Sequence, residues 1–378
     1  MGTAARLTGI TGITGLALAA GALFAGPASA STAHTGTDPV FVQTDNTGGN
    51  AVVAYDRSTD GRLIQAATYP TGGKGGILDG SAVDHLASQG SLAYDKANNL
   101  LYAVNAGSDT VTVFGVNGDR LTRRQVLSSG GAFPVSIAMH GNLVYVLNAR
   151  DGGSVQGFLR IGGTLLRIPT WHRALGLDPA ETPEFTSTPG QVAFTPDGSK
   201  LLVTTKDNGN DVDVFAVNIL GGLSAKPVVN SLPGAVPFAT TFDPKGHLVL
   251  AEAGPSAVAT FTVNPDGTLT GIASEATGQA ATCWIVGTGT KVYVSNAGSG
   301  SLSGYRASST GSLTALGNTA TDPGTVDATV TADGHYLYAQ TGANGIVDEF
   351  RVNKDGSLTS IGSVTVPGAV GGEGIAAA

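Results

Sequence analysis

The sequence has little charge and a single cysteine. Lys, Arg, Asp and Glu make up 13% of the 378 residues, and the formal net charge is −8. Because no run of basic residues is present, neither nucleic acid nor an anionic membrane surface is expected as a partner. Cys283 alone cannot form an intramolecular disulfide, so packing and hydrogen bonds must stabilise the fold. A chain of this length with 41% hydrophobic residues can bury a core large enough for that.

Several common site motifs are also missing. The chain has no zinc-ligand spacing, no glycine-rich phosphate loop and no nucleophile elbow. We therefore expect neither a metal nor an organic cofactor. Acidic residues in long loops leave a calcium site open in principle, although no ligand spacing favours one.

The first thirty residues have the pattern of a secretory signal peptide. Arg6 is their only charged residue, and a long stretch of apolar and small residues follows it. Ala28-Ser29-Ala30 then matches the A-x-A pattern of signal peptidase sites. We predict cleavage after Ala30, a secreted protein, and no membrane span after cleavage. The alternative is an uncleaved anchor, which the many Gly and Thr residues of the stretch disfavour.

Glycine is abundant, with 56 residues, and much of it belongs to a repeated turn. A turn rich in Gly, Asp and Asn, followed by Leu, occurs seven times, and the intervals are 44 to 46 residues except for two of 58. Each unit contains four short segments of strand character separated by turns, as in a propeller blade. A β-helix has shorter repeats, and a tandem sandwich would not give seven equal units. The seven leucines are Leu63, Leu121, Leu165, Leu223, Leu269, Leu313 and Leu358.

We therefore predict an all-β fold, a seven-bladed β-propeller of four-stranded antiparallel blades over residues 40–378. A flexible segment, 31–39, precedes it. The first strand, Val40 to Thr44, corresponds to the second strand of a blade. Residues 374–377 resemble a first strand without a blade, so their pairing with Val40 to Thr44 would close the ring and remove two exposed edges.

Polar residues end the second strands and should meet at one rim of the ring, which we call the top. The first strands begin at the same rim. Gln191 begins one of them, and Cys283 begins another. The Asn residues are also good turn residues, and a lone Cys is often a buried filler, so structural roles remain open. The candidate substrate-binding residues are Asn105, Asn148, Gln191, Asn296, Gln340 and Cys283.

Lys206 and Glu252 depart from the Asn that is usual at this rim, and a turn requires neither. They are candidate catalytic residues, although a salt bridge between neighbouring blades would also explain them. The two long intervals place inserts at about 70–88 and 167–187 over the same face. His85 and His172 lie in these inserts and are candidate acid–base groups.

The sequence resembles the seven-bladed lactonase family, which includes 6-phosphogluconolactonase and the carboxymuconate-lactonising enzyme. The resemblance rests on Val192-Ala193-Phe194-Thr195-Pro196-Asp197-Gly198, on Asn105-Ala106-Gly107-Ser108-Asp109 and Asn296-Ala297-Gly298-Ser299, and on the repeated turn. It implies lactone chemistry without a cofactor. Where the family has a His and an Arg-His pair, this chain has Gln191 and Phe238-Ala239, whereas Glu252 matches the family's acidic residue.

Two functions follow as expectations. The first is hydrolysis or isomerisation of a lactone or similar cyclic ester at the channel mouth, where Lys206 polarises the carbonyl and Glu252 transfers protons. The second is a non-catalytic extracellular propeller that binds a ligand or a protein. In either case we expect a monomer with a small-molecule ligand.

Overall fold

The computed structural model describes Met1 and residues 37–378 of the chain. The predicted signal peptide lies outside these residues, apart from Met1, and so does most of the predicted segment 31–39. The first strand, β1 (Thr37–Gln43), begins slightly before the predicted start. No helix in the described part of the chain is long and apolar enough to cross a membrane.

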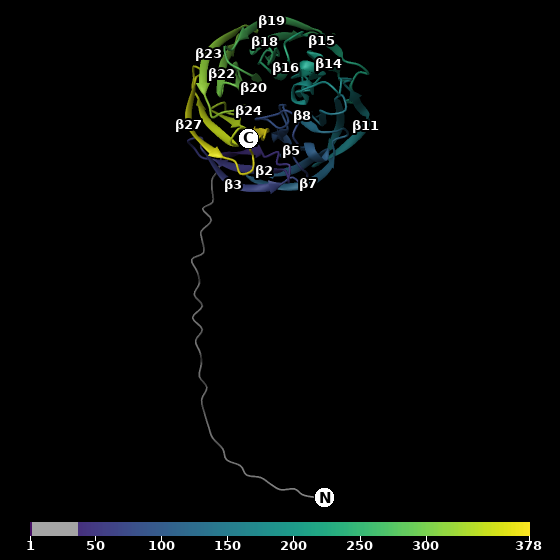
Figure 1. The fold of residues 1–378 in the computed structure, drawn as a ribbon, viewed down its shortest axis with the longest axis vertical. Helices are drawn as coiled ribbons and strands as arrows, with labels where there is room; N and C mark the ends of the chain where they lie inside the picture. The colour runs from purple at the N-terminus through teal and green to yellow at the C-terminus, as the bar shows by residue number, and fades with distance from the viewer. Residues whose placement is uncertain (2–36) are drawn as a thin grey trace. The chain divides into compact units, whose positions relative to one another are not determined.

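Within residues 37–378, twenty-eight strands form seven antiparallel four-stranded sheets, which confirms the predicted propeller. The fourth strand of each blade lies on the outside of the ring, and the first strands surround the axis (Figure 1). The strands of each blade are given from the axis outward. Blade 1 is β28 (Ile375–Ala377), β1, β2 (Ala51–Arg57) and β3 (Leu63–Pro70), and blade 2 is β4 (Leu92–Asp95), β5 (Leu100–Asn105), β6 (Thr110–Asn117) and β7 (Arg120–Ser128). Blade 3 is β8 (Pro134–His140), β9 (Leu143–Asn148), β10 (Ser154–Ile161) and β11 (Thr164–Ala174). Blade 4 is β12 (Gln191–Phe194), β13 (Lys200–Thr204), β14 (Asp211–Ala216) and β15 (Val228–Ser231); blade 5 is β16 (Pro237–Phe242), β17 (Leu248–Glu252), β18 (Ala257–Val263) and β19 (Leu269–Ala276); blade 6 is β20 (Thr282–Thr288), β21 (Lys291–Asn296), β22 (Ser301–Ala307) and β23 (Leu313–Ala320); blade 7 is β24 (Thr325–Val330), β25 (Tyr336–Thr341), β26 (Ile346–Val352) and β27 (Leu358–Thr365).

The C-terminal strand closes the ring as predicted. β28 pairs antiparallel with β1 through Val40↔Ala377, Phe41↔Ala376 and Val42↔Ile375. The backbone N–H of Ala378 also donates to the carbonyl of Pro39 at 3.0 Å. Blade 1 is therefore built from both ends of residues 37–378, and β1 is paired on both sides, with β28 and with β2.

The repeated glycine turns connect neighbouring blades. Tyr145 of blade 3 donates its hydroxyl to the carbonyl of Gly221 in blade 4 at 2.7 Å. Tyr338 of blade 7 does the same to Gly61 of blade 1 at 2.6 Å. Gly61 and Gly221 take the positive φ that the tight hairpin needs, and a Cβ there would meet the ring of Tyr336 or the side chains of Leu143 and Trp171 in the neighbouring blade. These copies of the turn therefore anchor the adjacent blade.

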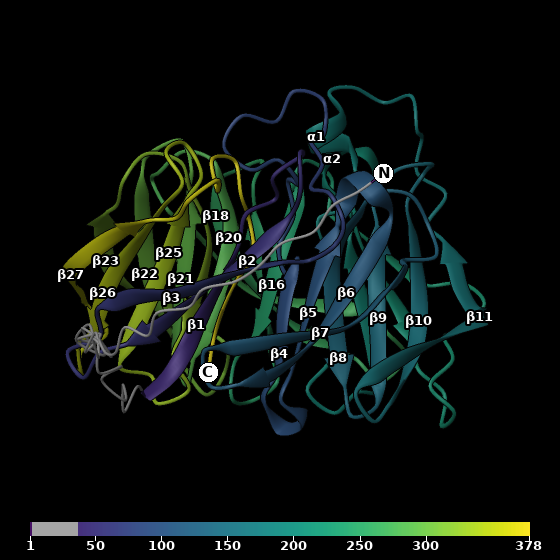
Figure 2. The ribbon, with the colours of Figure 1, turned by 90° about the horizontal axis from the view of Figure 1, so that it is seen from below.

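Two long connections rise over the top face, beside the short helices α1 (Glu184–Ser187) and α2 (Lys206–Gly209) (Figure 2). The first insert, residues 71–91, joins β3 to β4. The second insert, residues 175–190, joins β11 to β12. It leaves its blade later than predicted, because residues 167–174 continue the outer strand β11. The remaining helical turns, η1 (Lys96–Asn98) and η2 (Ala106–Ser108), lie between strands of blade 2.

Candidate functional site

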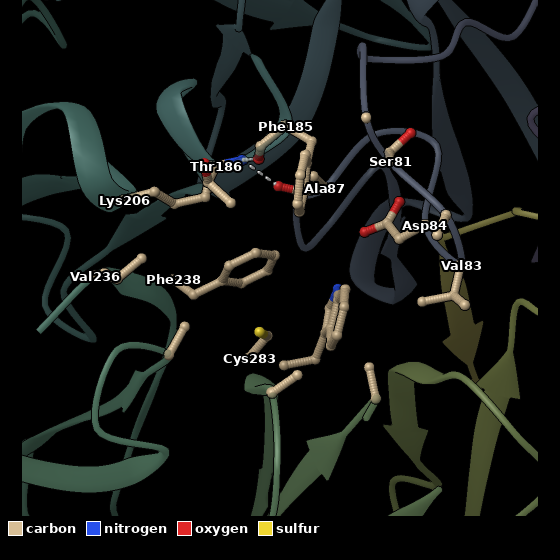
Figure 3. A pocket seen from close by; sticks show the side chains of 16 residues that line it. Ser81, Val83, Asp84, Ala87, Phe185, Thr186, Lys206, Val236, Phe238 and Cys283 are labelled. Atoms are coloured by element: carbon tan, nitrogen blue, oxygen red, sulfur yellow. Dashed lines mark hydrogen bonds between the residues drawn. The ribbon is translucent and has the colours of Figure 1, made fainter. Parts of the chain in front are cut away.

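A cavity of about 190 Å³ lies at the top of blades 4, 5 and 6, beneath the two inserts. Phe238, Cys283 and Trp284 come from first strands, and Lys206 stands at the start of α2 (Figure 3). The inserts contribute residues 80–84, Ala87, Phe185 and Thr186, and the remaining walls are Val236, Ala253, Ala281 and Ala297. Most of these side chains are hydrocarbon, so the cavity is an apolar space with a few polar groups in its walls.

The first insert also crosses the axis of the ring. The side-chain amide of Gln89 accepts the N–H of Ile285 at 2.7 Å and donates to the carbonyl of the same residue at 2.9 Å. The indole N–H of Trp284 donates to the carbonyl of Ser88 at 2.6 Å. Because β20 and β4 belong to blades 6 and 2, these bonds hold the insert across the axis. The cavity, which is lined from blades 4, 5 and 6, lies to one side of the axis.

The second insert is bound to the first through Glu184. This carboxylate accepts two bonds from the guanidinium of Arg150, at 2.6 and 3.0 Å, and one from the N–H of Asp79 at 2.7 Å. The ion pair keeps the pKa of Glu184 below its usual value. α1 is thereby fixed above the cavity.

Lys206 forms hydrogen bonds to both inserts. Its ammonium group donates to the carbonyls of Ala87 (2.7 Å) and Phe185 (2.5 Å) and to the hydroxyl of Thr188 (3.1 Å). It also lies 5.4 Å from the ring centre of Phe238. An ammonium has three N–H donors, and here each has a protein acceptor. Burial lowers the pKa of Lys206 to about 7, which the nearby carboxylate of Asp84 partly opposes.

Asp84 lines the side of the cavity across from Lys206 (Figure 3). Its two oxygens accept the N–H groups of Leu86 (2.8 Å) and Ser88 (3.0 Å), which fixes the turn of the first insert. Burial raises the pKa of Asp84 to about 6, although these bonds and the charge of Lys206 act against the rise. Asp84 is thus a carboxyl group that changes its protonation near neutral pH at the wall of an apolar cavity.

Three further buried carboxyl groups lie close to Asp84, where the first insert meets the closing strand. Asp45 accepts the N–H of Glu373 at 2.8 Å, and Asp327 accepts the N–H of Ile375 at 3.3 Å. The Glu373 carboxylate accepts the N–H of Gly90 at 2.9 Å. Burial raises the pKa of Asp45 to about 8 and those of Asp327 and Glu373 in the same direction. Among the described residues, no group of three or more His, Cys, Asp or Glu is arranged to hold a metal ion.

Of the sequence-predicted site residues, Lys206 and Cys283 line this cavity. Burial raises the pKa of the Cys283 thiol to about 12, so the sulfur is a thiol rather than a nucleophilic thiolate. Glu252 ends β17 nearby but is not in the cavity wall. Its carboxylate bonds to Ser274 of the same blade, and burial raises its pKa.

Each of the three predicted asparagines donates a hydrogen bond within its own blade, and Asn105 also accepts one from Asn50 of blade 1 at 3.2 Å. Asn105 donates to Thr112 at 2.9 Å, Asn148 to Ser154 at 3.4 Å, and Asn296 to Ser303 at 2.9 Å. Each side chain therefore ties the end of a second strand to the third strand. All three are fully buried and none lines the cavity.

The remaining candidates are dispersed. Gln191 accepts the N–H of Thr240 at 2.5 Å, and Gln340 contacts the carbonyl of Gln43 at 3.4 Å. His172 is exposed on the outer strand β11. His85 is half-buried against the C-terminal segment, and burial lowers its pKa. None of the four is a lining residue of the cavity.

Asp84, Phe238 and Trp284 form the walls but were not singled out as site residues by sequence reasoning. The signal for Asp84 was its place in a long insert that breaks the repeat. Phe238 and Trp284 gave no such signal, because they follow the apolar pattern of any first strand.

Comparison with known proteins points to one family. The family model described as "Lactonase, 7-bladed beta-propeller" matches residues 59–371. The periplasmic gluconolactonase of Pseudomonas aeruginosa has a similar structure, with 17% identity, a TM-score of 0.72, and coverage of 90% of this chain and 98% of the other. A putative 6-phosphogluconolactonase from Bacteroides fragilis is 19% identical, with a TM-score of 0.70 and coverage of 92% of this chain and 99% of the other. A protein from Lactobacillus plantarum is 20% identical, with a TM-score of 0.72 and coverage of 90% of this chain and 99% of the other. At these identities the structural likeness shows the fold. No curated protein matches the sequence.

Proposed function

Because this chain belongs to the lactonase family of seven-bladed β-propellers, we propose that it hydrolyses a small cyclic ester in the cavity beneath the inserts. The observation that carries the proposal is the position of Asp84, a carboxyl group with a pKa near 6 in an otherwise apolar wall. The neighbours described as gluconolactonase and putative 6-phosphogluconolactonase support this class of reaction.

Asp84 is the general base in this proposal. It takes a proton from a water molecule whose oxygen adds to the acyl carbon of the ester. The tetrahedral intermediate then releases the ring oxygen, which receives that proton, and the product is the open hydroxy acid. A carboxylate has about four acceptor positions, and the two backbone bonds of Asp84 leave room for a water.

Lys206 supplies the positive charge for the oxygen of the intermediate. The bond from its ammonium to Thr188, at 3.1 Å, is the longest of its three. Exchange of that hydroxyl for the substrate oxygen leaves one bond to each insert intact, to Ala87 and to Phe185. Because Glu252 contacts Ser274 and not the cavity, Asp84 takes the proton-transfer role that the sequence suggested for Glu252.

The test is lactone hydrolysis by the full chain and three variants. Asp84→Asn should lower kcat at least about 100-fold, in the range for a general base. Ala297→Leu should fill the cavity and abolish turnover, whereas Ala280→Leu, which alters an exposed residue outside the wall, should not. In the parent protein kcat/KM should rise with pH through about 6, as Asp84 ionises, and fall above about 7, as Lys206 loses its proton. Turnover that survives both Asp84→Asn and Ala297→Leu would place the reaction elsewhere.

Non-catalytic ligand binding is the second candidate, and one observation favours it. Every N–H donor of Lys206 already has an acceptor, so the resting site offers no free cation to a carbonyl oxygen. Saturable binding that Ala297→Leu abolishes, with no turnover of any lactone, would support this function over hydrolysis.

We also propose that the protein acts after export. The proposal follows from the signal-peptide pattern of residues 1–30. Intact-mass measurement of exported protein should give a chain that begins at Ser31, and an exported chain that retains Met1 would contradict cleavage.

A further inference from the structure

The walls of the cavity restrict the ester that it can hold. We propose that the ligand is an uncharged, largely hydrocarbon lactone of one ring or two fused rings, and neither a sugar lactone nor a phosphorylated one. The hydrolysis of this ligand rests on the proposed function, whereas the ligand class is argued from the walls alone.

The apolar surfaces suit a flat ring. The rings of Phe238 and Trp284 meet edge to face, with centroids 4.9 Å apart and planes at 60°. Val83 packs against the same apolar cluster from the first insert. A dry apolar cavity of about 150 Å³ can accommodate benzene. The volume here, about 190 Å³, therefore fits a ring of that size with a short substituent or a second ring.

The polar donors in the walls are already occupied. Ser81 donates its hydroxyl to the carbonyl of Leu78 at 2.8 Å, and Thr186 donates to the carbonyl of Pro183 at 3.2 Å. The Trp284 indole N–H is bound to Ser88, and Lys206 uses all three of its donors. Of the lining side chains, only the weak thiol donor of Cys283 has no acceptor. A sugar lactone would bury several hydroxyl oxygens without a donor, which strongly disfavours its binding.

The charges in and near the walls disfavour an anion. No arginine lines the cavity, and its lysine is committed to the inserts. Asp84 lies in the wall and is negatively charged above its pKa of about 6. A phosphate group in the cavity would lose its hydration without gaining a free cation, and it would face the Asp84 carboxylate.

Binding and hydrolysis can be measured separately on the full chain. The protein has two tryptophans, so Trp171→Phe leaves Trp284 as the sole fluorescent indole. Trp171 stacks on Tyr145 of the same blade, and phenylalanine retains an aromatic ring there. In this background, quenching is recorded with dihydrocoumarin, glucono-δ-lactone and 6-phosphoglucono-δ-lactone. Hydrolysis of the same three compounds is followed by acid release.

We expect dihydrocoumarin to quench Trp284 saturably and to be hydrolysed with kcat/KM at least about 100-fold above either sugar lactone. Ala297→Leu should remove both signals, and the matched control Ala280→Leu should keep both.

The outcomes separate the two proposals. Saturable quenching by dihydrocoumarin alone, without hydrolysis, would uphold the ligand class and refute the proposed reaction. Hydrolysis of a sugar lactone at an equal or higher kcat/KM, abolished by Ala297→Leu, would uphold the reaction and overturn the ligand class. The absence of both quenching and hydrolysis with every compound would refute both.

Discussion

Replacement of Glu373 with glutamine should stabilise the protein at neutral pH, although the side chain is completely buried. One carboxylate oxygen of Glu373 accepts the N–H of Gly90 at 2.9 Å, and the other has no donor. The carboxyl group of Asp327 lies within hydrogen-bond reach of Glu373. A glutamine oxygen can keep the bond to Gly90, and its NH₂ group can donate to Asp327.

The magnitude follows from proton linkage. Burial and the neighbouring carboxylates, of which Asp327 acts most strongly, raise the pKa of Glu373 well above its usual value. The folded protein therefore keeps a proton that the unfolded chain releases above pH about 4.5. Stability is complete below that pH and falls as pH rises toward the folded pKa, by about 1.4 kcal/mol per unit. Each pH unit of this fall corresponds to roughly 2 °C in Tm for a large domain.

The assay is thermal unfolding of the parent protein and Glu373→Gln at pH 5 and pH 7. The two should have similar Tm at pH 5, and the variant should unfold at a higher temperature at pH 7, by roughly 2 °C for each pH unit above pH 5 over which folded Glu373 keeps its proton. Lys206 and the other buried acids also titrate in or near this range and are present in both proteins, so the difference reports Glu373 together with its effect on the carboxyl groups that it faces, Asp327, Asp84 and Asp45. Glu275→Gln, at an exposed position of β19, is the control and should change neither value. A variant less stable than the parent at pH 7 would refute the reasoning.

Three other predictions concern the closure, the channel and the thiol. Removal of residues 375–378 should lower Tm sharply, because β1 loses its inner partner; an unchanged Tm would refute closure by β28. Gln89→Leu should cost about 2–3 kcal/mol in urea unfolding, because the N–H and carbonyl of Ile285 lose their partners, and a cost near zero would show that water replaces them. Cys283 should not react with a thiol reagent in the folded protein at pH 8 but should react fully in denaturant; rapid reaction of the folded protein would contradict its burial and its raised pKa.

The fold could be predicted because the propeller repeats its local chemistry. The period of the Gly-Leu turns fixed the number of blades, and a strand without a blade at residues 374–377 indicated the closure. The ends of the elements were less predictable. β11 runs to Ala174 because residues 172–174 pair with β10 again after an irregularity at 168–171, although their sequence resembles a loop at the start of an insert.

The site could be predicted only in part. Lys206 was identified because it breaks the pattern of asparagines at the top rim, and it does line the cavity. The asparagines themselves were indistinguishable from ligand-binding residues, since nothing in the sequence shows that Asn105 and Asn296 bond to the next strand. Asp84 could not be placed because its neighbours in space come from the far side of the ring. Only the folded path of the first insert brings it to blades 5 and 6.

One short segment of the first insert contributes both to the cavity wall and to the contacts beside the closing strand. Within residues 84–91, Asp84 contributes the cavity wall, Gln89 binds blade 6 across the axis, and Gly90 binds Glu373 beside the closing strand. Movement of the segment away from the axis would break the bonds to blade 6 and to the closing strand together, because they are made by adjacent residues. The first insert therefore cannot uncover the cavity by this movement without also losing its bond beside the closing strand. A change such as Glu373→Gln, which strengthens the closure, should also hold Asp84 more firmly in the cavity wall, although it lies outside the wall itself.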